Sequence, residues 1–207
     1  MEYANISENF EMTEVAKNMY MESNFDYKRF DKFEADDYFV GKINEKSYQI
    51  YDVDVIKIVQ NKGRKFEESI FRGLFAIMQF ETSVSDEIRL VNKKIFKLSK
   101  EYVKELTDIE LNKNFVVYSK NKLLAMQIFT SDFVQILNDY VEKFDMKFEI
   151  LLKNSNIFVR FYSGPMFEPL IFEDKVNKEL LYFYYYTLFF VRNVIQNIDR
   201  ALLESEL

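Results

Sequence analysis

Apolar side chains recur at the three- and four-residue spacing of an amphipathic helix in four segments of the chain. These segments are residues 9–22, Lys93–Leu106, residues 131–144 with Ser131 as the expected cap, and a long final segment, residues 174–204. Each is predicted to be a helix that packs one side on a core. The final segment opens with the nearly continuous apolar run Leu180–Val191, which is shorter than the about 20 residues that span a bilayer.

Other segments are rich in β-branched and aromatic residues, which is typical of strands. They are Phe39–Ile43, Ser47–Val59, Ile70–Phe80, Ile88–Val91 and Phe115–Tyr118. Two further runs, Lys147–Leu152 and Ile157–Tyr162, flank the polar sequence 153–156 and predict a hairpin. Together these elements predict an α+β fold, in which a mostly antiparallel sheet is packed by a central helix, residues 131–144, and by the long C-terminal helix.

The chain is predicted to form one domain. Only four Gly and two Pro punctuate its 207 residues, and we find no internal repeat and no linker rich in Gly, Ser or Pro. This length is close to that of a single domain. We expect one domain over residues 1–207, with an N-terminal helix and connector in residues 1–30 and the α+β core in residues 31–205.

The absence of histidine and cysteine narrows the possible chemistry. Without them there is no Ser–His–Asp triad, no Cys–His pair and no ordinary zinc site. Catalysis would have to use carboxylates, Lys, Tyr, Ser or Arg, and no catalytic motif built from these residues is present. We therefore expect a protein that is not an enzyme and that has no cofactor.

Charge bears on the partners and on the location of the protein. The net charge is −6, whereas nucleic-acid-binding proteins usually show a basic surface, so no nucleic-acid partner is expected. The N-terminus carries Glu2, Glu8, Glu11 and Glu14 where a secretory signal needs basic residues and an apolar run. A cytoplasmic location is therefore expected.

Four short sequences, in this order, are shared with a known bacterial family. They are Asp37-Tyr38-Phe39-Val40-Gly41, Ile70-Phe71-Arg72-Gly73-Leu74-Phe75, Phe115-Val116-Val117-Tyr118-Ser119 and Phe167-Glu168-Pro169. The chain resembles the family called domain of unknown function 3137 over about Phe30–Arg200. The resemblance implies no activity, ligand or site residue. Members often carry two membrane helices ahead of this domain, and this chain shows none. The resemblance therefore implies either the cytoplasmic part of such a membrane protein, at the inner face of the membrane, or a member of the family that is soluble.

Two acidic side chains can be read as a metal site. Asp52 and Asp54 are two residues apart on a predicted strand, so both side chains point to one face of the sheet. Hard cations such as Mg²⁺ and Ca²⁺ bind carboxylate oxygens. The alternative, a solvated strand face, is favoured because no glycine-bearing calcium loop accompanies the pair.

Three arginines interrupt apolar runs. If Arg72, Arg160 and Arg192 converge, they can bind a carboxylate or a phosphate in bidentate fashion. The favoured alternative is that each takes an outward position on its own element and covers apolar surface with its stem.

A row of lysines and a run of tyrosines are the candidate contact surfaces. Lys93, Lys97, Lys100 and Lys104 line one side of a predicted helix, which suits either anionic lipid headgroups or plain solvent. Tyr184, Tyr185 and Tyr186 cannot all face the core, because successive helical residues point about 100° apart. The outward rings predict an interface with a partner protein or a second copy.

These observations favour a binding or scaffolding module without enzymatic activity, with a protein partner or self-association. The alternative is a peripheral domain that binds lipid or a small anion through the Lys93–Lys104 side or the arginines. Contact with a membrane surface fits either function.

Overall fold

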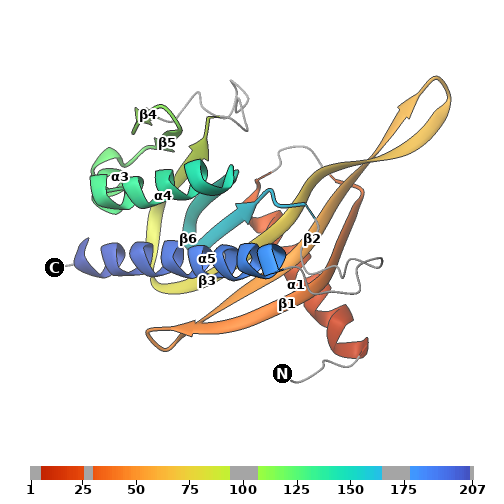
Figure 1. Cartoon of the computed structure of the whole chain (residues 1–207), viewed down its shortest axis with the longest axis horizontal. Coiled ribbons are helices and arrows are strands. Elements are labelled where there is room, and N and C mark those ends of the chain that lie inside the picture. Colours follow the sequence, from red (N-terminus) through yellow and green to blue (C-terminus); the bar gives the residue numbers. More distant parts are fainter. Residues whose placement is uncertain (1–5, 26–29, 94–106, 165–177, 206–207) are drawn as a thin grey trace.

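The computed structural model describes residues 6–25, 30–93, 107–164 and 178–205 (Figure 1). The helices are α1 (Ile6–Ser23), α3 (Lys122–Ile128), α4 (Ser131–Phe144) and α5 (Lys178–Ser205). The strands are β1 (Lys32–Ile43), β2 (Lys46–Asn61), β3 (Arg64–Asn92), β4 (Thr107–Glu110), β5 (Phe115–Ser119) and β6 (Phe148–Phe161). The sheet runs in the order β1-β2-β3-β5-β4, β6 pairs with β3, and each of these pairings is antiparallel. The α+β prediction is confirmed.

The segment β6 folds back on itself inside the bend of β3. Its second half, residues 156–161, pairs with residues 74–79 of β3, and its first half, residues 149–152, pairs with residues 88–91. The backbone N–H of Tyr162 donates to the carbonyl oxygen of Lys147 at 2.9 Å, and Asn154 turns the chain with a φ of 55°. This is the geometry of the hairpin predicted for this segment, with its two arms enclosed by one long strand.

Side chains that alternate along the central strands build a core on each face of the sheet. In β3, Leu74, Ala76 and Met78 enter the core beneath α3, α4 and α5, while Phe75 and Ile77 enter the core beneath α1. Because this part of β3 is buried on both faces, successive side chains enter one core or the other, which explains the near-continuous apolar run Ile70–Phe80. The molecule therefore has three layers, with α1 on one side of the sheet and the other helices on the opposite side (Figure 1).

The C-terminal half of α5 is fastened to the turn between β1 and β2. Asp199 on α5 is 1% exposed, and its Oδ1 accepts a charged hydrogen bond from Lys46 Nζ at 2.8 Å. Its Oδ2 accepts another from Asn44 Nδ2 at 3.2 Å. Both Asn44 and Glu45 have a positive φ, so this tight turn presents its polar side chains to the helix.

Several element boundaries differ from those expected. β3 runs unbroken from Arg64, whereas the sequence suggested separate strands from Ile70 and from Ile88. The N-cap of α4 is Thr130, whose hydroxyl oxygen accepts the N–H of Phe133, and not Ser131. Neither β4 nor α3 was expected, while residues 94–106 of one predicted helix and residues 174–177 of another lie outside the described residues. Within the described parts of the chain, no helix has both the length and the apolar character needed to span a membrane.

Candidate functional site

The outward side of α5 is apolar in its first half and mostly polar in its second, where Leu203 is the exposed apolar exception at 44%. The exposed side chains of the first half are Leu181, Tyr182, Tyr185 and Phe189, here called the α5 apolar face. Tyr185 leaves 64% of its surface in solvent. At 100° per residue the same outward direction continues through Arg192, Gln196 and Arg200, which are hydrated easily. The first half of the helix therefore leaves large apolar side chains exposed.

A lysine and three rings connect the α5 apolar face to α4. The Lys143 ammonium lies 4.8 Å from the ring centre of Tyr186, 5.1 Å from that of Phe144 and 5.9 Å from that of Tyr182. The Tyr182 and Tyr186 rings are 4.1 Å apart, and the side-chain hydrogen bond between them is the largest cause that raises the pKa of Tyr186. Cation–π contacts with Lys143 stabilise the arrangement of these rings at the surface.

A cavity of about 240 Å³ opens beside this arrangement. Its lining residues are Phe144, Asp145, Met146, Lys147, Phe161, Tyr162, Ser163, Phe183 and Thr187. Asp145, with a φ of 48°, ends α4, and the chain then turns into β6. The two ends of the β6 hairpin lie side by side, joined by the hydrogen bond from Tyr162 N–H to the carbonyl oxygen of Lys147. The cavity thus arises where α4 stops short of the open end of the β6 hairpin.

The α5 apolar face and the cavity lie on different sides of α5, because the cavity-lining Phe183 and Thr187 point about 160° away from Tyr185 around the helix. The rings of Tyr182, Tyr186 and Phe144 connect the two. Phe144 lines the cavity and also contacts Tyr186, with ring centres 5.4 Å apart. The cavity offers apolar rings inside and the polar groups of Asp145, Lys147 and Ser163 among its lining. Such a combination can hold one apolar group and hydrogen-bond what is attached to it.

The three predicted interface tyrosines have three different environments. Tyr185 points outward, Tyr184 packs partly against the core, and Tyr186 lies between Lys143 and Phe144. The sequence argument that they cannot all face the core agrees with this arrangement. It did not locate Tyr182 and Phe189, which have the same outward direction as Tyr185 one turn away.

The structure describes one of the four predicted lysines. Lys93 Nζ lies 2.9 Å from Glu110 Oε1 at the surface. Lys97, Lys100 and Lys104 lie outside the described residues. Lipid contact through this row stays a prediction.

The three predicted arginines do not converge. Arg72 lies on the α5 side of the sheet, 3.3 Å from the carboxylate of Asp54. Arg160 is buried on the α1 side, and Arg192 is exposed on α5. Because the sheet separates Arg160 from the other two, these residues do not form one anion site.

Asp52 and Asp54 share a face of β2 as expected, but neither is fully solvated. Asp52 is buried to 8% exposure, and Asp54 accepts a hydrogen bond from Ser69 Oγ at 2.6 Å in addition to its ion pair with Arg72. Among the residues that the structure describes, no group of three or more potential acidic ligands is suited to a metal ion.

Arg160 instead belongs to a buried cluster of charges that also contains Arg89 and Glu149. All three side chains are at most 1% exposed. Glu149 accepts from Arg89 Nη2 at 3.3 Å and from Arg160 Nε, and Arg160 Nη1 donates to the Tyr20 hydroxyl of α1 at 3.0 Å. Arg89 also donates to the carbonyl oxygen of Phe25 at 3.1 Å, just after α1. The cluster therefore binds the end of α1 to the sheet.

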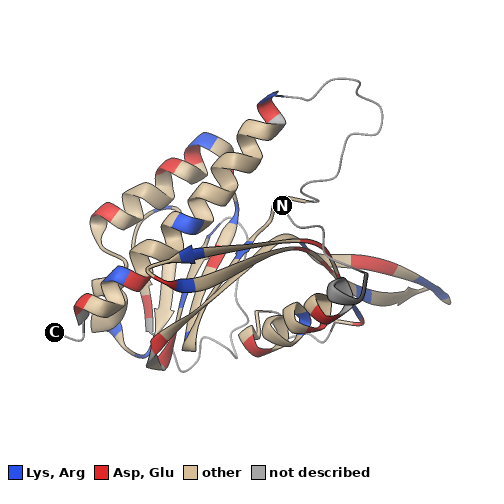
Figure 2. Cartoon of the chain, turned by 90° about the horizontal axis from the view of Figure 1, so that it is seen from below, with Lys and Arg blue, Asp and Glu red and all other residues tan. Residues whose placement is uncertain are grey.

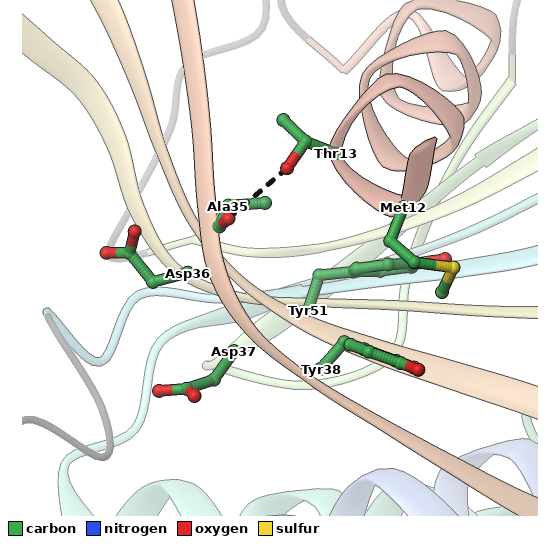
Figure 3. Close-up of a pocket in the computed structure, with 7 residues that line it drawn as sticks. All are labelled: Met12, Thr13, Ala35, Asp36, Asp37, Tyr38 and Tyr51. Carbon is green, nitrogen blue, oxygen red and sulfur yellow. Dashed lines mark hydrogen bonds between the residues drawn. The ribbon is translucent and has the colours of Figure 1, made fainter. Parts of the chain in front are cut away.

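A second hollow lies where α1 crosses β1, and Figure 3 shows its lining. The register of β1 shifts between Ala35 and Tyr38, so Asp36 and Asp37 form a bulge, and their carboxylates point away from Met12 (Figure 3). Burial and the nearby Asp36 raise the pKa of Asp37. The volume of about 10 Å³ has room for about one water, so this hollow is not a ligand site.

Comparisons with known proteins identify a family and a distant structure. A search of the curated proteins found no match. The crystal structure of the mycobacterial trehalose monomycolate transport factor A, TtfA, is 11% identical, covers 74% of this chain and 83% of its own, and has a TM-score of 0.42, which is too low to inform function. The family model described as protein of unknown function (DUF3137) matches residues 69–200. The match starts within β3, later than the Phe30 expected from the sequence, and spans more than half of the chain. The chain therefore belongs to the DUF3137 family.

Proposed function

We propose that this domain is a non-enzymatic binding module that docks a partner protein on the α5 apolar face and holds one apolar side chain of that partner in the adjoining cavity. The observation that carries the proposal is the change along α5, from exposed Tyr and Phe at positions 182–189 to Arg and Gln at positions 192–200. A helix surface that contacts only solvent is normally polar along its whole length, so the exposed rings of the first half call for another explanation.

The size of the cavity favours a protein side chain over a lipid or a small molecule. Pockets that enclose drug-sized ligands measure about 300–1,000 Å³. The cavity here, at about 240 Å³, is below that range and opens at the surface. A shallow pocket that takes one anchor residue beside exposed aromatic rings is typical of the centre of a protein interface.

Charge around the cavity sets an expectation for the partner. Lys143 and Lys147 are exposed on either side of Asp145 where α4 passes into β6, while the neighbouring Glu142 forms an ion pair with Lys113 at 3.2 Å, so two lysines and one aspartate remain beside the cavity. Tyr and Phe provide contact area, while the lysines favour acidic groups nearby. We expect the docked segment to carry a large apolar residue with Asp or Glu close to it.

The chemistry of the chain supports binding rather than catalysis. The chain has no His or Cys, and the cavity lining contributes Asp145, Lys147 and Ser163 as its charged or hydroxyl-bearing groups besides Tyr162 and Thr187. Thr187 Oγ1 is engaged with the carbonyl oxygen of Phe183 at 2.9 Å within α5. A cytoplasmic location at the inner face of the membrane stays a prediction.

Selection of peptides on the immobilised protein tests this function. Peptides from a random display library should converge on a large apolar residue with a neighbouring Asp or Glu. Their binding should fall at least about tenfold for Ser163→Phe, because the new ring fills the cavity from a half-buried lining position.

The matched control is Ser155→Phe, which places the same ring at another half-buried serine, in the turn of β6 away from the cavity. Peptides that bind both variants as well as the unchanged protein would contradict the proposal. A selection that yields only purely basic peptides would contradict the charge argument.

A further inference from the structure

The hairpin of β2 and β3 extends beyond the rest of the sheet as a two-stranded arm (Figure 1). We define the arm as residues Ile58–Glu67, in which Val59 pairs with Phe66 and Asn61 with Arg64. On one side, the pairing of β1 with β2 begins at Ile56, and on the other, the pairing of β6 with β3 begins at Leu74. The two strands of the arm therefore pair only with each other.

Such a ribbon gains little stability from its own residues. Isolated two-stranded hairpins are marginally stable in water, because neither face is buried. In this arm Phe66 remains 47% exposed and Ile58 40% exposed. A long arm that leaves an aromatic ring and a branched aliphatic side chain in water suggests a binding role.

The tip of the arm is positively charged although the protein is acidic. Residues 60–66 include Lys62, Arg64 and Lys65 and no carboxylate, whereas Glu67 at the base of the arm forms an ion pair with Lys32. Figure 2 shows the arm with a blue tip beyond a red segment. The turn itself is open, because a Cβ added at Gly63 would meet nothing within 4 Å.

The length of the arm separates this charge from the acidic body. Four residues of extended strand, from Ile58 to Lys62, reach about 13 Å. The Debye length at physiological ionic strength is about 8 Å, so carboxylates in the body of the protein are largely screened at the tip. Glu67 and Glu68 at the base of the arm are closer, two and three residues from Lys65, but Glu67 is paired with Lys32, so a negatively charged surface would first meet the three cations at the tip.

We propose that the tip of the β2–β3 arm binds an anionic lipid surface, with Lys62, Arg64 and Lys65 among the headgroups and the ring of Phe66 behind them in the outer part of the headgroup layer. The register places Phe66 and Arg64 on one face of the ribbon, and Ile58 and Lys65 on the other. Cations and apolar groups thus surround the tip. A headgroup layer that encloses the tip fits this distribution better than a nucleic-acid groove or a protein surface, which would use one face.

The test is cosedimentation of the purified chain with vesicles of phosphatidylcholine, with and without phosphatidylserine. Each cation near an anionic surface strengthens binding about fivefold, so the triple variant Lys62→Glu, Arg64→Glu, Lys65→Glu should lose about a hundredfold or more. The control variant Lys113→Glu, Lys120→Glu, Lys122→Glu makes the same change in net charge at exposed positions on and near α3, and should bind nearly as the unchanged protein does.

A second measurement reports insertion directly. The chain has no Trp, so Phe66→Trp introduces a single reporter at the tip. Its emission should shift to the blue with phosphatidylserine vesicles and not with phosphatidylcholine alone. Absence of vesicle binding by the unchanged protein, equal losses in the two triple variants, or a preference for a duplex DNA oligonucleotide over vesicles would overturn the proposal. This surface is separate from the α5 apolar face, so either proposal can fail without the other.

Discussion

Replacing Glu149 by Gln tests the role of the buried charge cluster. In the native protein the Glu149 carboxylate accepts hydrogen bonds from two guanidinium groups, and all three side chains are at most 1% exposed. Gln has nearly the same shape and keeps one acceptor oxygen, but it leaves Arg89 and Arg160 charged and buried without the carboxylate. The cost arises mainly in the folded protein, where the side chain is buried.

The magnitude follows from the burial of the pairs. Removal of one partner of a buried ion pair costs about 3–5 kcal/mol, because the remaining charge is left uncompensated. The retained amide oxygen puts Glu149→Gln near the lower limit, about 3 kcal/mol. Arg160→Met removes one of the two cations and leaves Arg89 paired with Glu149, so the lost contacts with Phe25 and Tyr20 should cost only about 1–2 kcal/mol.

Urea denaturation followed by far-ultraviolet circular dichroism measures both variants against the unchanged protein. Glu149→Gln should lower the free energy of unfolding by more than Arg160→Met does, with an unchanged dependence on urea concentration. An equal or larger loss for Arg160→Met would refute the reasoning, because it would mean that the number of buried charges matters less than the packing of the Arg160 side chain.

Three further predictions concern the positions that fix the strands and α5. Gly73→Ala should destabilise the protein by roughly 3 kcal/mol or more, because Gly73 has a φ of +148° and an added Cβ would collide with the backbone of β6. Gly63→Ala, at the open tip of the arm, should cost only about 1 kcal/mol. Thermal unfolding of the two variants measures the difference. Asp199→Ala should cost about 2 kcal/mol in urea denaturation, since it leaves Lys46 and the turn that carries it without their acceptor, and a loss below about 0.5 kcal/mol would show that the turn is not fastened there. Burial raises the pKa of Tyr51 to about 12, so the contribution of the neutral side chain to stability should be complete below pH 10 and disappear as the pH rises through about 12. A difference in the free energy of unfolding between the unchanged protein and Tyr51→Phe that stays constant from about pH 10 to about pH 12 would contradict this.

The fold was predictable where one periodicity dominates. Phe133, Leu137 and Val141 of α4 are buried at helical spacing, as the sequence indicated, whereas Ile136, expected on the same side, is 37% exposed and Val134 is buried instead. The arm could not be recognised in the same way, because the residues from Arg64 to Ser69 are nearly all polar and solvated on both faces, so no alternation marks them as a strand. Their pairing with β2 supplies the structure that composition does not reveal.

The buried arginine shows what a local pattern leaves out. An Arg in an apolar run suggested either an anion site or an outward position for Arg160. The predicted hairpin already held the missing information: with its turn centred between Asn154 and Ser155, Glu149 lies opposite Arg160. The contact of Arg89 with Glu149 could not be predicted from the sequence, because it depends on the pairing of β6 with a strand some 60 residues earlier.

The site was predictable in part for a similar reason. Three successive tyrosines on a helix require at least one outward ring, and the structure shows that Tyr185 is the exposed one. The cavity could not be foreseen, because it depends on α4 ending at Asp145 just where the two ends of β6 meet under α5. Long-range pairing, and not local sequence, sets that arrangement.

The most direct measurement of the central claim is site-specific photo-crosslinking in the cells that make the protein. A benzophenone amino acid is placed at Tyr185 on the α5 apolar face and, as the control, at Gln196, which has the same outward direction on the polar half of α5. The account predicts a discrete crosslinked protein from position 185, lost when Ser163→Phe fills the cavity, and none from position 196. Equal crosslinking from both positions, or a product at position 185 that Ser163→Phe leaves unchanged, would contradict a docking surface built from the α5 apolar face and its cavity.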